Sequence, residues 1–284
     1  MLRDIVNLLL YGGAFIGLCA SSITALTFEL TGDVESHYPY ILLIGVSTAL
    51  LYSAHRVIGL HKLSHVITHD RYAVIRKYKQ HIWLYCLIWM GLTLWFFLPL
   101  ANIELILWLV PGGSIALAYV LPWLSKGRRL RDLGWIKIVL IGWSWAWLTA
   151  FLPAYHFQEV PVHLAILIGM ERMLFIIAIT IPFEIRDMVI DKSVGLMTMP
   201  SKFGMVMTMR VGKVLCLVTI LLSMVIAFHF IVPAYALAMV ITCMITLWIL
   251  KKSATIDDDY FFSGVTDGTM ILAVFFYWVL QDVL

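Results

Sequence analysis

Three carboxylates occur close together in an otherwise apolar part of the chain. Glu184, Asp187 and Asp191 are spaced three and four residues apart, and such residues share one face of an α-helix. Carboxylates on one face repel each other, and the dipole at a helix C-terminus also disfavours negative charge. A cation would compensate, and Mg²⁺ suits the position because it takes carboxylate oxygens and leaves room for water and phosphate. A solvated helix end beside Arg186 and Lys192 is the alternative interpretation.

The surrounding segment, FEIRDMVIDKSVGLMTMPSKFG, runs from Phe183 to Gly204. It resembles the second acidic motif of the UbiA superfamily of intramembrane prenyltransferases, in which D-x-x-D-x-x-x-D precedes Gly, Thr, a Leu-Pro or similar pair and a final Gly. The corresponding residues are Glu184, Asp187, Asp191, Gly195, Thr198, Pro200 and Gly204. The segment YVLPWLSKGRRL, from Tyr119 to Leu130, resembles more weakly the family's Tyr-Pro-Lys/Arg loop after the fourth span.

This resemblance implies one transmembrane prenyltransferase-like domain over residues 1–284, with nine helices and an active site at the cytoplasmic mouth. It implies a prenyl diphosphate donor, a lipophilic acceptor and Mg²⁺ as the cofactor. Glu184, Asp187 and Asp191 would be the metal ligands, and Asp187 and Asp191 would be the catalytic residues. The metal would neutralise the departing diphosphate.

The family's first acidic motif, N-D-x-x-D-x-x-x-D at the end of the second span, is missing. The equivalent segment, YSAHRVIGLHK from Tyr52 to Lys62, contains no carboxylate. Arg and Lys bind phosphate directly, Arg through two parallel hydrogen bonds. We therefore expect a cationic wall on the second span to face the carboxylates of the sixth, with the diphosphate between them. The candidate diphosphate contacts are His55, Arg56, Lys62, Lys126, Arg128, Lys192 and Lys202.

The missing motif leaves two other functions open. One is a non-catalytic membrane protein that binds or carries a lipid phosphate. The other is a terpene-cyclase-like member, in which the prenyl chain attacks itself and no acceptor is needed.

Composition requires a membrane environment for this chain. Of its 284 residues, 62% are hydrophobic and only 13% are charged, whereas soluble domains have about 25% charged residues. The mean hydropathy is +0.94. A net charge of +3 without a basic tail gives little support to nucleic-acid binding.

Nine stretches are long and apolar enough to span a bilayer as helices. They cover residues 6–30, 38–60, 81–100, 103–123, 134–153, 163–185, 211–231, 233–250 and 264–283. Lys and Arg follow the even-numbered stretches and avoid the other loops, so the positive-inside rule puts the N-terminus in the cytoplasm. We expect a multi-pass protein of the cell (inner) membrane whose active site faces the cytoplasm.

Further polar residues allow two interpretations each. Glu171 and Arg172 lie well inside the sixth span, where charges face a cavity or a packing partner. Asp267, at the start of the ninth span, could face the cytoplasmic mouth. The acidic run at residues 257–259 before it is expected to be a solvated loop.

Overall fold

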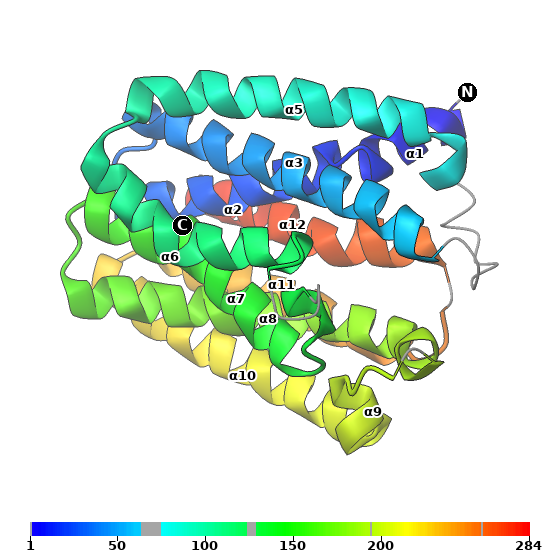
Figure 1. Cartoon of the computed structure of the whole chain (residues 1–284). Helices are drawn as coiled ribbons and strands as arrows, with labels where there is room; N and C mark the ends of the chain where they lie inside the picture. The colour runs from blue at the N-terminus through cyan, green and yellow to red at the C-terminus, as the bar shows by residue number, and fades with distance from the viewer. Residues whose placement is uncertain (1, 64–74, 124–128, 194, 257) are drawn as a thin grey trace.

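The computed structural model describes residues 2–63, 75–123, 129–193, 195–256 and 258–284, with only the backbone given for residue 2 and for residues 59–63. These parts of the chain are helical, and the long helices run side by side as one bundle (Figure 1).

Among the described residues, nine helical segments have the length and hydropathy of membrane spans. The all-helical, nine-span prediction is confirmed. The nine are α2 (Ala14–Thr31), α3 (Tyr38–Leu63), α5 (Lys79–Leu100), α6 (Ile103–Val120), α7 (Ile136–Ala146) with the π-helical turns η4 (Trp147–Phe151) and η5 (Pro153–Phe157), α8 (Val162–Ser193), α10 (Met205–Phe230), α11 (Pro233–Lys252), and α12 (Asp267–Gln281) preceded by the π-helical turn η6 (Phe261–Thr266). Shorter elements are α1 (Leu2–Tyr11), η1 (Glu35–His37), η3 (Leu130–Asp132) and α9 (Met199–Phe203).

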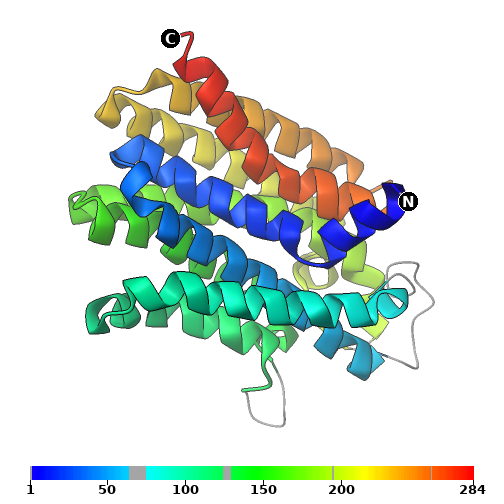
Figure 2. The same ribbon diagram turned by 90° about the horizontal axis from the view of Figure 1, so that it is seen from above.

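The order of helices around the bundle explains how distant segments meet. Helix α3 packs against α2 and α5, α7 against α8, and α10 against α8 and α11. Helix α12 packs against both α11 and α2, which closes the ring. The two termini lie at opposite ends of the helices (Figure 2), as an odd number of spans requires. The largest buried apolar cluster lies between α2, α8, α10, α11 and α12.

Helix α8 is longer than the sequence pattern predicts. It has 32 residues and continues to Ser193 instead of ending near residue 185. Glu184, Asp187 and Asp191 therefore remain on regular helix. They share one face of α8, as their spacing predicts, because the helix does not end before them.

The first predicted span is divided in two. Helix α1 ends at Tyr11, and the membrane span α2 begins at Ala14 instead of residue 6. Gly13 has a φ of 82°, which glycine adopts without strain. The Gly12 carbonyl accepts hydrogen bonds from Ser53 Oγ and Trp89 Nε1, both at 2.8 Å. Side chains of α3 and α5 thus satisfy the backbone that the break exposes, and the break redirects the end of α1 toward α3.

We predict that Gly13→Ala destabilises the protein. A Cβ there would lie 2.5 Å from Ala49 O and Ser53 Oγ, on a backbone that disfavours any side chain. The left-handed conformation and the overpacking together should cost about 2–4 kcal/mol. Gly113→Ala is the control, because Gly113 lies in α6 with no atom within 4 Å of its added Cβ. Thermal unfolding in detergent measures both, and equal midpoints would contradict the role of the break.

Candidate functional site

A cavity of about 300 Å³ opens between α3, α6, α7, α8 and η6. One part of its wall is polar and charged, formed by Tyr11, Tyr52, His55, Arg56, Tyr119, Arg131, Lys137, Glu184, Arg186, Asp187, Asp259 and Asp267. The other part is mainly apolar, formed by Ile44, Leu51, Ile115, Ala116, Ile141, Trp145 and Leu148. Along α3, Ile44 and Arg56 are about 18 Å apart at 1.5 Å per residue. The cavity therefore extends from a charged mouth to an apolar interior.

Two of the three predicted carboxylates share one lysine. Lys137 Nζ lies 2.8 Å from Glu184 Oε1 and 3.2 Å from Asp191 Oδ2. All three side chains are buried. Lys137 is near the start of α7, so this contact joins α7 to α8. Lys137 is not among the site residues predicted from the sequence. A lone lysine inside a predicted span is nevertheless a signal, because an intramembrane charge needs a partner.

The third carboxylate, Asp187, is bound by the arginine that precedes it. Arg186 donates to Asp187 Oδ1 at 2.8 Å and Oδ2 at 3.1 Å, and to Asp259 Oδ1 at 2.7 Å. Its guanidinium also lies 5.1 Å from the ring centres of Phe183 and Phe262. The prediction that the acidic run at 257–259 is simply a solvated loop is wrong for Asp259, which reaches into the mouth from the segment before η6.

The end of α1 completes this side of the mouth. The Tyr11 hydroxyl donates to Asp259 Oδ2. Burial, with the negative charge of Asp259 as a further cause, raises the pKa of Tyr11, so the hydroxyl keeps its proton and remains a donor.

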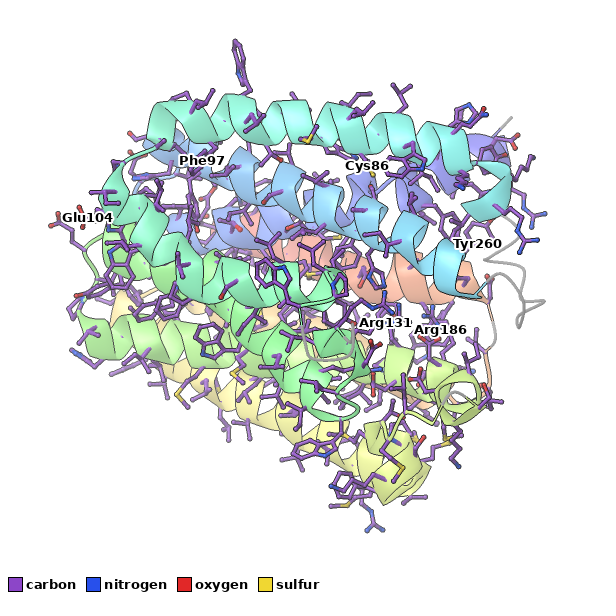
Figure 3. All side chains as sticks on the ribbon, in the orientation of Figure 1. Cys86, Phe97, Glu104, Arg131, Arg186 and Tyr260 are labelled. Carbon is purple, nitrogen blue, oxygen red and sulfur yellow. The ribbon has the colours of Figure 1, made fainter. Side chains whose placement is uncertain are left out.

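Helix α3 contributes Arg56 and His55 to the wall of the cavity. Arg56 lines the cavity, donates to the carbonyl of Leu10 and lies 5.3 Å from the ring centre of Tyr11. Arg56 therefore also caps α1, which ends one residue later. His55 accepts from Arg131 Nη1 at 2.5 Å. Figure 3 shows Arg131 and Arg186 in the same region of the bundle, far from Glu104 at the opposite end.

The remaining predicted cations are not brought to this cavity by the described structure. Lys192 and Lys202 are exposed and do not line it. Lys192 follows Asp191 directly, and adjacent residues face different sides of a helix. Lys202 lies in α9, 5.0 Å from the ring centre of Trp135. Lys126 and Arg128 lie outside the described residues, as does the side chain of Lys62.

No protein-family model and no curated protein sequence matches this chain. Solved structures do match it over nearly its whole length. A UbiA homologue from Archaeoglobus fulgidus bound to GPP and Mg²⁺ has a TM-score of 0.64 at 14% identity, covering 97% of this chain and 99% of that one. A UbiA homologue from Aeropyrum pernix K1 in its apo form has a TM-score of 0.65 at 14% identity, covering 95% and 98%. Digeranylgeranylglyceryl phosphate synthase has a TM-score of 0.55 at 14% identity, covering 99% and 100%.

The chain has the UbiA fold. At 14% identity these structures establish the architecture of a multi-pass membrane protein, while the chemistry must be argued from the residues of this chain. The acidic motif at residues 183–204 resembles the same family whose fold this chain has.

Within this UbiA fold the carboxylates of α8 do not fit a magnesium site in the arrangement described. Mg²⁺ takes an octahedron of oxygen ligands at about 2 Å. Here Lys137 lies between Glu184 and Asp191, and Arg186 binds Asp187. No group of three or more His, Cys, Asp or Glu side chains in the described parts of the chain is placed to hold a metal. The expected compensating charge is present, but it comes from the protein's own lysine and arginine.

Glu171 and Arg172 do not line the cavity. Arg172 donates to Ile23 O at 2.6 Å, and Glu171 accepts from Ser223 at 3.0 Å and Tyr235 at 3.2 Å. Both are buried and connect α8 with α2, α10 and α11. Of the two roles left open by the sequence, packing is the one that the structure supports.

We predict that Arg172→Met destabilises the protein, because it leaves Glu171 without a neighbouring positive charge inside the bundle. Breaking a buried pair in this way costs about 3–5 kcal/mol. Arg210→Met on the exposed side of α10 is the matched control and should have little effect. Thermal unfolding in detergent distinguishes them, and equal stability of the two variants would contradict a packing role.

Proposed function

We propose that this chain is a membrane prenyltransferase, a single domain that binds a prenyl diphosphate and transfers the prenyl group to a lipophilic acceptor. The observation that carries the proposal is the polarity of the cavity. Its mouth contains four cationic side chains, Arg56, Arg131, Lys137 and Arg186, together with carboxylates, and its interior is mainly apolar. A prenyl diphosphate likewise has a charged group at one end and an apolar isoprenoid tail at the other. The A. fulgidus homologue, which shares the fold, was solved with GPP.

The proposed reaction places the diphosphate against the guanidinium groups of the mouth. The bond between the allylic carbon and the diphosphate oxygen breaks, and its electron pair stays on the oxygen. Guanidinium and ammonium donors that are already oriented stabilise this growing charge. Asp187 and Asp259 hold Arg186 in position, and Glu184 and Asp191 hold Lys137. The acceptor forms a new bond to the allylic carbon and gives up its proton to water, and the diphosphate leaves with the electron pair of the broken bond.

Aromatic side chains of the cavity suit the other product of the cleavage. Tyr52, Trp145 and Phe183 line the cavity. The face of an aromatic ring attracts a cation, and the attraction is stronger where water is excluded. These rings would stabilise the allylic cation while the acceptor approaches.

In the proposed orientation the protein spans the cell (inner) membrane with its mouth facing the cytoplasm. The mouth lies at the end of the bundle where α3 ends and α7 begins. The loops at this end carry the basic residues, and such loops stay in the cytoplasm. A water-soluble diphosphate product would then be released to the cytoplasm.

We predict that purified protein in detergent binds radiolabelled geranyl diphosphate and that Arg131→Ala and Arg186→Ala weaken binding at least tenfold. A charge-assisted hydrogen bond contributes about 1.5–3 kcal/mol, which corresponds to about tenfold or more in affinity. Lys202→Ala is the control, because it removes an exposed cation away from the cavity.

The outcomes separate the functions left open by the sequence. Release of diphosphate that depends on an added lipophilic acceptor supports transfer. Release without any acceptor indicates a cyclase-like reaction, and tight binding without release indicates a lipid-phosphate binder. An absence of binding, or equal binding by all three variants, refutes the proposal.

A further inference from the structure

We propose that Lys137 takes the place of a divalent metal ion on the α8 carboxylates, so that this site binds diphosphate without Mg²⁺. The part concerning diphosphate rests on the function proposed above, whereas the part concerning the metal does not. The A. fulgidus homologues of the same fold were solved with Mg²⁺ together with GPP or DMAPP. This chain would use a lysine of its own instead.

The contacts of Lys137 give the first argument. Its ammonium group carries three donors. Two of them are directed to Glu184 Oε1 and Asp191 Oδ2, at 2.8 and 3.2 Å. Because Lys137 also lines the cavity, the third can be offered to a ligand there. The lysine thus joins carboxylates on one side to a cavity on the other, as a bridging metal ion would.

The second argument is that a metal ion and the Lys137 ammonium group would compete for the same two carboxylates. A metal ion bound by both Glu184 and Asp191 would have to occupy the space between them, where the ammonium now lies. Two positive charges this close repel strongly in a site shielded from water. The other carboxylate pair of the mouth, Asp187 and Asp259, is likewise bridged by a cation, Arg186.

The backbone around Lys137 gives the third argument, because it fixes the lysine relative to α8. Gly134, just before α7, has a φ of 67°, and a Cβ on it would lie 2.5 Å from Met197 O. The Trp135 amide donates to this same carbonyl at 3.0 Å. The Leu196 amide donates to Asp191 O at 2.8 Å. The start of α7 is therefore docked on the segment that follows α8, which holds Lys137 beside its two carboxylates.

Manganese titration of the purified protein tests the metal part without any prenyl ligand. Calorimetry should detect no saturable Mn²⁺ site in the wild type. Lys137→Met should create one, because it leaves two carboxylates facing each other without a cation. Adding Glu184→Gln to that variant should remove the site again. Lys137→Arg keeps a cation at this position and should behave as the wild type.

Geranyl diphosphate binding by the wild type, in EDTA and in millimolar Mg²⁺, tests the diphosphate part. We expect the same affinity in both buffers. Affinity lost in EDTA and restored by Mg²⁺ would overturn the inference, and so would saturable Mn²⁺ binding to the wild type that Glu184→Gln abolishes. These measurements need only the wild type and the Glu184→Gln variant. They therefore test the inference about Lys137 even if Lys137→Met does not fold. Failure to bind geranyl diphosphate in either buffer refutes the proposed function, while the manganese titration still decides the role of Lys137.

Discussion

Charges inside an apolar bundle must be paired, because an uncompensated charge away from water costs several kcal/mol. Among the residues that the structure describes, three sets of paired charges include residues of α8. Lys137 connects α8 with α7, and Arg186 connects α8 with the segment before η6. Glu171 and Arg172 connect α8 with α2, α10 and α11. Helix α8 is therefore connected through charged side chains to α2, α7, α10, α11 and the segment before η6. The cavity lies where two of these sets face α3.

The same paired charges hold the cations of the cavity mouth in place, and this affects how well they could stabilise a developing negative charge. Carboxylates that hold lysine and arginine keep these cations in fixed positions, and a fixed donor stabilises developing charge without reorganising during the reaction. Relatives with the UbiA fold were solved with Mg²⁺, yet here the α8 carboxylates contact side-chain cations. Arg56 on α3 and Lys137 on α7 both place positive charge at the wall of the same cavity.

Local sequence patterns were sufficient to predict the helical, nine-span architecture. Long apolar stretches and the placement of Lys and Arg depend only on neighbouring residues, and they predicted nine spans within a few residues of most observed ends. The shared face of Glu184, Asp187 and Asp191 was predictable for the same reason. Their partners were not, because Lys137 and Asp259 come from segments distant in sequence. The break at Gly12 and Gly13 was missed because flanking apolar residues continue the pattern, while its cause lies in Ser53 and Trp89.

The length of α8 has a consequence for where an amphiphilic molecule would react. Its 32 residues span about 48 Å, whereas the hydrocarbon layer of a bilayer is about 30 Å thick. Part of the helix must therefore extend past the acyl chains to the depth of the lipid headgroups, and its polar C-terminal turns are the part suited to that layer. A molecule with an ionic head and a greasy tail partitions to the same depth unaided. The proposed prenyl diphosphate would then lie at the depth of the charged mouth without moving further into or out of the membrane.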